Sequence, residues 1–264
     1  MTTFFRKEKL MSKSESDFSP SGTLYGVSVG PGSPDLLTIR ALRILESVPT
    51  VAYPKSVSDG GSQARDIVAG YMASRKSAPR IVELVFPMTK DEVVLEKARM
   101  ENARLLTESL TMGDVAFISI GDILFYSTFG NLLSGLKKVL PRLKVSVVPG
   151  ITSFNGAAAR IVEPLVQGAE SFAVIPATYE ASHIEKMIDL HETVVFMKIN
   201  RVIPSLLQLL DARGLLPNCI YLEHVETGRE LIIRDVSTLS GREIPYMSLL
   251  ILRKNGWGNH GQAS

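Results

Sequence analysis

The stretch Thr23-Leu-Tyr-Gly-Val-Ser-Val-Gly-Pro-Gly-Ser-Pro-Asp35 decides the fold of this 264-residue chain. Its first part, Thr23–Val29, is a short apolar and β-branched run, which predicts a buried strand. The glycines and prolines of Gly30–Asp35 end that strand in a tight loop. Glycines directly after a first strand favour a close approach of the backbone to a ligand, although the same spacing also fits a plain strand-to-helix turn.

Strands and helices alternate through the rest of the first half of the chain. An amphipathic helix is expected over Leu36–Glu46, and Thr89 with Glu92 forms a capping box for a longer helix that runs to about Leu110. The other expected elements are helices at 62–71 and 128–139 and strands at 50–53, 80–84, 114–120 and 144–148. This alternation indicates α/β architecture, with a parallel five-stranded sheet covered by helices on both faces.

The second half is less regular and predicts a second α/β domain with a mixed sheet. Ser182 and Glu185 form another capping box, and Gly214 suits the end of a helix over Pro204–Arg213. A further helix is expected at 153–161, with strands at 171–175, 193–197, 218–223, 230–233 and 247–252. We expect a disordered tail or leader at 1–22, an N-terminal α/β domain at 23–149, a C-terminal α/β domain at 150–253 and a polar tail at 254–264.

Composition narrows the class of protein. A hydrophobic content of 45% excludes a wholly disordered chain. The net charge of +2, from 29 Lys and Arg against 27 Asp and Glu, does not indicate nucleic-acid binding. No apolar run approaches the ~20 residues that a membrane-spanning helix needs. The single cysteine, Cys219, excludes an intrachain disulfide and a cysteine-cluster metal site. We therefore expect a cytoplasmic protein without membrane partner or bound metal.

The segment Ile120-Gly-Asp-Ile-Leu-Phe-Tyr-Ser-Thr128 follows the fourth expected strand. Ligands bind at the carboxyl ends of the strands in open α/β sheets. Gly121 and Asp122 offer backbone amides and a carboxylate, and two aromatic residues flank them. This set suits a nucleoside-like, positively charged ligand, while capping of the following helix by Asp122 explains the same residues equally well.

Two further strand ends carry polar or polarisable side chains. Thr152 and Ser153 follow a Pro-Gly turn, where their hydroxyls either cap a helix or reach a ligand. Met197 ends another expected strand, a position more typical of the core than of a ligand site. A phosphate loop is excluded because no Gly-Lys-Ser/Thr follows Gly30, and Asp35 stands where the dinucleotide fingerprint needs its third glycine.

Together these segments resemble the tetrapyrrole methylases, the S-adenosylmethionine-dependent family of cobalamin and sirohaem biosynthesis. The resemblance runs from about Thr23 to Arg253 and is carried by Val27–Thr38, Gly121-Asp122 and Val148–Thr152. Within the family, the segments 125–129, 152–154 and 157–160 are most similar to the enzymes that methylate C-20 of precorrin-2 or of its cobalt-bound form. The resemblance implies a homodimer, and two domains with S-adenosylmethionine in the cleft between them.

The resemblance also implies roles for individual residues. Those matching the family's cofactor-binding positions are Pro31, Gly121, Asp122, Phe125, Thr152, Ser153 and Met197. Ile123 replaces the usual proline after Gly-Asp, and Ser33 replaces a common acidic residue. The implied substrate is a reduced tetrapyrrole with several carboxylates, which need cationic partners. The candidates are Lys55, Arg160 and Lys198, although each also fits an ordinary solvated charge.

Several alternatives stay open at this level. The four histidines share no motif, and no residue is identified as a catalytic base. Another tetrapyrrole methylase, such as a uroporphyrinogen III or precorrin-4 methyltransferase, would show similar segments, and so would a non-catalytic ligand-binding module. Related methylases act on ribosomal RNA or on a protein, but an RNA substrate calls for a basic stripe that the sequence does not show.

Overall fold

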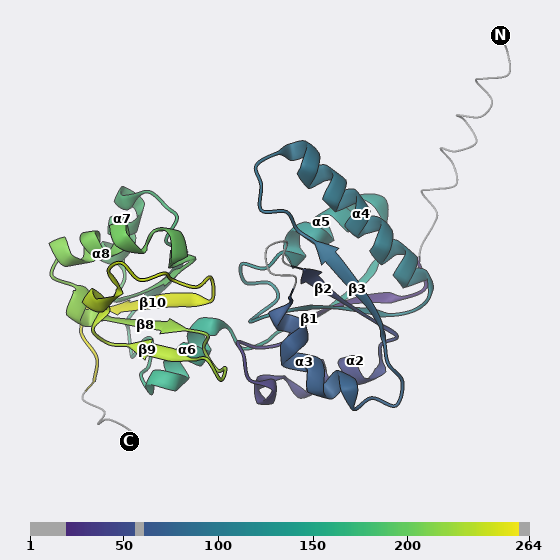
Figure 1. The fold of residues 1–264 in the computed structure, drawn as a ribbon, viewed down its shortest axis with the longest axis horizontal. Helices are drawn as coiled ribbons and strands as arrows, with labels where there is room; N and C mark the ends of the chain where they lie inside the picture. The colour runs from purple at the N-terminus through teal and green to yellow at the C-terminus, as the bar shows by residue number, and fades with distance from the viewer. Residues whose placement is uncertain (1–19, 56–60, 259–264) are drawn as a thin grey trace, which may run out of the picture. The chain divides into compact units, whose positions relative to one another are not determined.

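The computed structural model describes residues 20–55 and 61–258, so most of the expected N-terminal tail and residues 259–264 lie outside the described range. The chain divides into two compact units, one ending at Thr152 and the other beginning at Ser153. Within the described residues each unit carries one five-stranded sheet (Figure 1). The first sheet is parallel and the second is mixed, which confirms the expected fold class.

The first sheet has the strand order β3-β2-β4-β1-β5, and all its pairings are parallel. Its strands are β1 (Thr23–Ser28), β2 (Thr50–Lys55), β3 (Arg80–Val85), β4 (Val115–Ser119) and β5 (Lys144–Val148). Strand β4 is central, and β1 lies between β4 and β5, with Leu24 opposite Val115 on one side and Val145 on the other. The loops after β4, β1 and β5 therefore lie side by side at the carboxyl ends of the strands.

Helices cover both faces of this sheet. They are α2 (Ile39–Ser47), α3 (Gln63–Ala73), α4 (Glu92–Thr111) and α5 (Phe129–Val139), with a 3-10 turn, η1, at Pro34–Leu36. Helices α4 and α5 lie on one face and α2 and α3 on the other (Figure 1). Successive strand residues point to opposite faces of the sheet. Phe117 therefore stacks on Phe129, the first residue of α5, with ring centroids 5.6 Å apart, while Ile118 is buried on the α2–α3 side.

The starts of the helices differ from expectation. At α4 the N-cap is Asp91, whose carboxylate accepts from the amides of Val93 and Val94, whereas Thr89 accepts from the amide of Asp91. The Thr89–Glu92 capping box is therefore wrong. Aspartate closer to the helix offers an ionised acceptor to the same free amides, and this local competition decides the cap.

Two other helix starts also shift. Helix α7 (Ala181–Leu190) begins before Ser182, so the expected box with Glu185 is wrong as well. The helix expected from Leu36 begins at Ile39 instead, because Thr38 caps it by accepting from the amide of Ala41. A single threonine hydroxyl thus separates the 3-10 turn from α2.

The second sheet has the order β6-β7-β10-β8-β9, in which only β6 and β7 pair in parallel among the described strands. The strands are β6 (Phe172–Pro176), β7 (Thr193–Met197), β8 (Cys219–Glu223), β9 (Leu231–Ile233) and β10 (Ser248–Arg253). The remaining elements are α6 (Ser153–Ile161), α8 (Ile203–Ala212), η2 (Ile199–Arg201), η3 (Leu216–Asn218) and η4 (Val236–Leu239). Because β7 and β8 both run antiparallel to β10, they are parallel to each other, and their carboxyl ends lie at the same end of the sheet.

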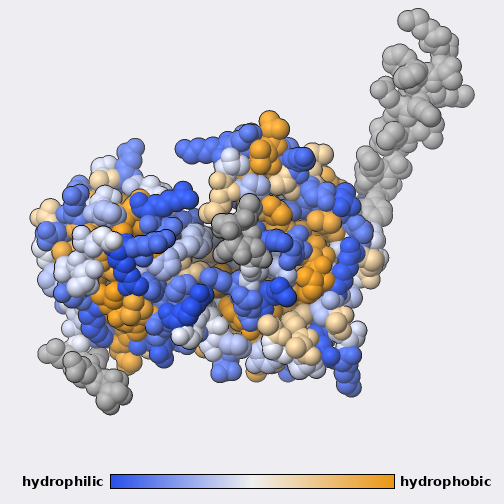
Figure 2. Space-filling model, viewed as in Figure 1, coloured by the Kyte–Doolittle hydropathy of each residue, from blue (hydrophilic) through white to orange (hydrophobic). Residues whose placement is uncertain are grey.

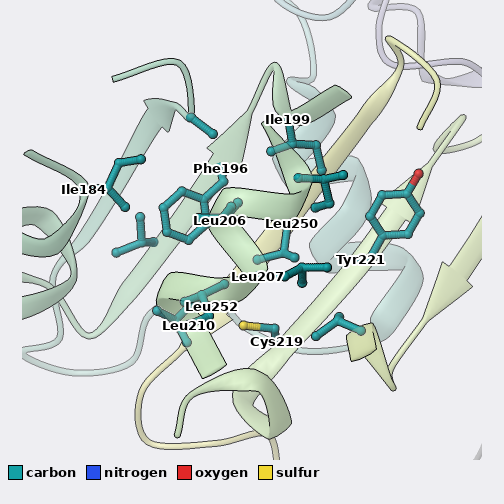
Figure 3. Close-up of a cluster of buried hydrophobic side chains, with 14 of the residues drawn as sticks. Ile184, Phe196, Ile199, Leu206, Leu207, Leu210, Cys219, Tyr221, Leu250 and Leu252 are labelled. Carbon is teal, nitrogen blue, oxygen red and sulfur yellow. The ribbon is translucent and has the colours of Figure 1, made fainter. Parts of the chain in front are cut away.

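Helices α7 and α8 pack on one face of this sheet. Figure 3 shows the resulting core, with Ile184 of α7 and Leu206 and Leu210 of α8 against Phe196 and Leu250 of the strands. The thiol of Cys219 belongs to the same cluster. The described part of the C-terminal tail contacts the residue before it, where the indole of Trp257 donates to the carbonyl of Asn218. No helix among the described residues is both long and apolar enough to cross a lipid bilayer.

The buried thiol supplies a test of this core. Burial raises the pKa of Cys219 to about 12, so the reactive thiolate is scarce at neutral pH. We expect the folded protein to resist a thiol-specific reagent such as Ellman's reagent at pH 8, and one thiol per chain to react in guanidinium chloride. Rapid stoichiometric reaction of the folded protein would contradict the placement of Cys219 in the core.

Candidate functional site

The candidate site lies where β4, β1 and β5 of the first unit end together. The loops that follow these strands are residues 29–33, 120–128 and 149–152. Each contains glycine or hydroxyl residues, and together they lie at the carboxyl edge, the place where parallel α/β sheets bind ligands. The contacts described below hold the three loops together.

A backbone pair joins the first two loops. The amide of Gly121 donates to the carbonyl of Gly30 at 2.7 Å, and the amide of Gly30 donates back to Gly121 at 3.3 Å. Gly30 and Gly121 lie in the left-handed region, with φ of +75° and +67° respectively. A Cβ at Gly30 would also lie 3.3 Å from the carbonyl oxygen of Leu36. Glycine is therefore the residue that this close pairing favours.

The carboxylate of Asp122 joins the second loop to the third. Its Oδ1 accepts from the amide of Leu124 at 2.9 Å, and its Oδ2 accepts from the amide of Gly150 at 2.9 Å. Helix α5 begins only at Phe129. The explanation of Asp122 as a helix cap is therefore wrong: it ties two strand ends together through charge-assisted hydrogen bonds.

Ser28 and Gly150 complete this arrangement, and sequence reasoning missed both. Ser28 is only 1% exposed at the end of β1, and its Oγ accepts from the amide of Ile123 at 2.9 Å. A Cβ at Gly150 would lie 2.4 Å from the Cβ of Ser28 and 2.9 Å from the carbonyl oxygen of Gly121. The available signal was a serine inside an otherwise apolar strand.

Two aromatic residues project from the second loop. The rings of Phe125 and Tyr126 meet edge to face, with centroids 4.8 Å apart. Phe125 is half-buried, whereas Tyr126 is exposed and has a φ of +50°. This left-handed conformation costs a residue with a side chain about 1–2 kcal/mol. Ser127 anchors the far end of the loop, because its Oγ lies 3.3 Å from that of Ser119 and accepts from the amide of Phe129.

The structure brings five of the residues assigned by resemblance to this edge. They are Pro31, Gly121, Asp122, Phe125 and Thr152, all in the first unit. The other two cofactor candidates belong to the second unit, where Ser153 begins α6 and Met197 ends β7. The carbonyl of Met197 accepts from the amide of Ala177 at 2.8 Å, so its backbone has a structural role.

Two of the three candidate substrate-binding cations already pair with a carboxylate. The ammonium of Lys55 lies 2.6 Å from Glu83, and the hydrogen bond to that carboxylate raises the pKa of Lys55. The guanidinium of Arg160 lies 2.8 Å from Glu230 in the second unit. The third, Lys198, directly follows β7 and has a left-handed backbone, with φ of +57°. A substrate carboxylate at Lys55 or Arg160 would therefore share its cation with a protein carboxylate.

Among the histidines, His224 lies at the end of β8 in the second unit. Burial lowers its pKa, which favours the neutral imidazole. Of the other histidines, His260 lies outside the described residues. Within residues 20–55 and 61–258, no three histidine, cysteine or acidic residues gather closely enough to hold a metal ion.

Comparison with known proteins gives a consistent set of relatives. Residues 23–238 match the sequence profile of the Tetrapyrrole (Corrin/Porphyrin) Methylases. A cobalt-precorrin-2 C(20)-methyltransferase of Salmonella typhimurium is 33% identical over 236 residues, which cover 89% of this chain and 97% of that protein. The cobalamin biosynthesis protein CobIJ of Mycobacterium tuberculosis is 30% identical over 243 residues. The match covers 89% of this chain, but the chain spans about half, 46%, of CobIJ's length.

A solved structure shows the same fold. The uroporphyrin-III C-methyltransferase of Thermus thermophilus, crystallised with S-adenosyl homocysteine, superposes with a TM-score of 0.61 at 21% sequence identity. The superposition covers 88% of this chain and 98% of the other. This likeness shows that the chain has the fold of that protein.

The contact between Gly150 and Ser28 predicts an asymmetric response to alanine. Gly150→Ala places a methyl group 2.4 Å from the Cβ of Ser28, and we expect a loss of about 1–3 kcal/mol in the free energy of unfolding. Gly135→Ala is the matched control, because α5 leaves its Cβ open space, and it should gain up to about 1 kcal/mol. Urea titration measures both, and equal stabilities for the two variants would contradict this packing.

Proposed function

This chain belongs to the tetrapyrrole (corrin/porphyrin) methylase family, and we propose that it works in the cytoplasm as the methyltransferase of C-20 in precorrin-2 or cobalt-bound precorrin-2. The observation that carries the proposal is its 33% identity to the Salmonella C(20)-methyltransferase across 97% of that protein. The match covers 89% of this chain, more than either unit alone, so it extends into both units. The reaction is a step of cobalamin biosynthesis and uses S-adenosylmethionine as methyl donor.

The loops of the first unit fit this donor. When bound, S-adenosylmethionine supplies a methyl group that its positive sulfonium has already activated. Backbone groups at Gly121, the hydroxyl of Thr152 and the ring of Phe125 would hold it. Asp122 uses each carboxylate oxygen once, which leaves lone pairs that accept from a ribose hydroxyl. The resemblance also assigns Ser153 and Met197, of the second unit, to this donor.

Positioning is the main task left to the chain. An activated methyl group reacts when the nucleophilic carbon is held in line with it at about 3–3.5 Å. The three tied loops present a surface whose backbone is already ordered, so binding costs less conformational entropy. Asp122 and Tyr126 are the titratable residues of these loops, and Asp122 is engaged with two amides. We therefore infer that orientation and exclusion of water supply most of the rate.

Recognition of the substrate depends on its carboxylates. We propose that Lys55, Arg160 and Lys198 contribute charge-assisted hydrogen bonds to them. The pairs Lys55–Glu83 and Arg160–Glu230 are consistent with this role if substrate binding draws each cation into a shared network. Prior pairing also orients the long side chains before the substrate arrives, which lowers the entropic cost of binding.

We also infer a homodimer, formed through the outer surface of the first unit. Hydrophobic side chains gather over α4 and the edge strand β3 (Figure 2), and those exposed are Ile81, Val85, Met88, Val93, Val94 and Met100. In the first half of α4, residues 92–101, no side chain is buried, although several are apolar. Charges of both signs lie along this helix and pair within it, so the helix surface carries no strong net charge against a second copy.

Transfer of a labelled methyl group tests the proposed reaction. The protein is incubated with S-adenosylmethionine carrying a 13C methyl group and, separately, with precorrin-2, cobalt-bound precorrin-2, uroporphyrinogen III or precorrin-4. We expect one label at C-20 with one or both precorrin-2 forms, located by NMR. Label on another carbon, or transfer only to uroporphyrinogen III, would contradict the assignment of C-20.

A pair of aspartate variants serves as the control for that experiment. Asp122→Ala leaves the exposed amide of Leu124 and the half-buried amide of Gly150 without their acceptor, which releases the third loop from the second and should abolish transfer. Asp211→Ala removes an exposed carboxylate from α8 and should leave transfer unchanged.

Light scattering after size-exclusion chromatography tests the dimer. The wild-type protein should show twice the chain mass of 28.9 kDa. The double variant Val93→Glu, Met100→Glu should be monomeric, because it buries two carboxylates in the proposed interface. Leu190→Glu, at an exposed residue of α7 in the second unit, is the control and should remain dimeric. A monomeric wild-type protein would refute the proposed assembly.

A further inference from the structure

A cluster of polar and charged side chains lies at the carboxyl ends of β2 and β3. The strand register places Tyr53 opposite Glu83, and Lys55 follows two residues further along β2. The ammonium of Lys55 lies 2.6 Å from Oε2 of Glu83, and the hydroxyl of Tyr53 donates to Oε1 at 3.2 Å. Both oxygens of this carboxylate are therefore engaged, which holds it against the sheet.

Arg65 acts on the same cluster from α3. Tyr53 packs beneath α2 and α3, and side chains two residues apart on a strand share a face, so Lys55 points to the face on which α3 lies (Figure 1). The hydrogen bond from Lys55 lowers the pKa of Glu83 most, and the positive charge of Arg65 lowers it further. Arg65 is exposed, and within residues 20–55 and 61–258 it forms no ion pair of its own.

The charges of these four side chains do not cancel. Lys55 and Glu83 form a neutral pair, and the two opposite charges held 2.6 Å apart attract a further anion only weakly, because their fields oppose each other. Arg65 adds a second positive charge near the same carboxylate. The cluster of Tyr53, Lys55, Arg65 and Glu83 therefore carries one surplus positive charge, which suits an anionic ligand.

The cluster also lies beside one of the loops of the candidate site. Strand β2 pairs with β4 only as far as Ala52 and Phe117, whereas its pairing with β3 continues to Lys55. On the other side of β2 from β3 lie the end of β4 and the loop 120–128 that follows it. Neighbouring strands are about 4.8 Å apart, so a ligand held at that loop comes within reach of the long side chains of Lys55 and Arg65.

We propose that Arg65 binds a carboxylate of the substrate together with Lys55, and that its charge is what makes Lys55 available for this contact. The proposal rests on the proposed function for the class of ligand, a tetrapyrrole with several carboxylates. Without Arg65, the substrate would compete with Glu83 for the single charge of Lys55. With Arg65, two cations serve two carboxylates, one from the protein and one from the substrate, through charge-assisted hydrogen bonds.

Three variants test this balance of charge. Arg65→Gln removes the surplus charge. The double variant Arg65→Gln, Glu83→Gln also removes the carboxylate that neutralises Lys55, so the surplus returns. Lys76→Gln is the matched control, because it removes one exposed positive charge just beyond the opposite end of α3. Each variant is assayed for melting temperature, for the Kd of S-adenosyl homocysteine, and for the Kd of sirohydrochlorin, a tetrapyrrole with carboxylate side chains, by its absorbance without methyl donor.

We expect Arg65→Gln to raise the Kd for sirohydrochlorin about tenfold at low salt, the loss of one charge-assisted hydrogen bond, with unchanged melting temperature and affinity for S-adenosyl homocysteine. High salt should narrow the difference from wild type, because it screens exposed charges. The double variant should recover most of the lost affinity, and Lys76→Gln should bind like wild type.

Wild-type affinity of Arg65→Gln for sirohydrochlorin would overturn the proposal. So would a double variant that binds as weakly as Arg65→Gln, since freeing Lys55 would then have no effect. An equal loss in Lys76→Gln would also overturn it, because the effect would come from the overall charge of the protein and not from this cluster.

The same assays separate this proposal from the proposed reaction. If the wild-type protein binds sirohydrochlorin but transfers no methyl group, the reaction is refuted while the role of Arg65 is still measured by the variants. If it transfers the methyl group and Arg65→Gln binds sirohydrochlorin like wild type, only the role of Arg65 is refuted. Failure of the wild-type protein to bind sirohydrochlorin would refute the carboxylate site.

Discussion

The carboxylate of Asp122 is the contact on which the site depends, because it accepts amides from two loops at once. Parallel strands are about 4.8 Å apart, so loops after β4 and β5 are separated by the full width of β1. One short side chain bridges that gap only if the residues between are small. Ser28 and Gly150 meet this condition, and the Gly30–Gly121 backbone pair draws the remaining loop to the same place. The small residues are thus a consequence of the bridge.

The sequence predicts the strands and most of the helices because their signals are local. Hydrophobic runs, the glycine-rich loop after Thr23–Val29 and the Gly121-Asp122 pair are all visible within a few residues. The same locality explains the errors. Thr89 is the predicted cap, but the helix amides reach the carboxylate of Asp91, which lies two residues nearer the helix.

The parts of the site that were missed depend on contacts between distant residues. Ser28 and Ile123 are 95 positions apart, and Asp122 and Gly150 are 28 apart. Their hydrogen bonds exist because β1 lies between β4 and β5, a strand order that hydrophobic periodicity does not reveal. Family resemblance assigns Asp122 to the cofactor, but the structure adds that the same carboxylate first holds two loops together.

Left-handed residues other than glycine also occur at strand ends of the second unit, where Lys198 follows β7 and His224 follows β8. The amide of His224 donates to Met247, and its carbonyl accepts from the hydroxyl of Thr227. Hydrogen bonds on both sides fix this backbone without help from glycine, just as Ser127 and Asp122 fix it around Tyr126. Strain at these turns is therefore tolerated because neighbouring bonds determine the conformation. A side chain other than glycine can therefore occupy these strand ends, where parallel α/β sheets place functional residues.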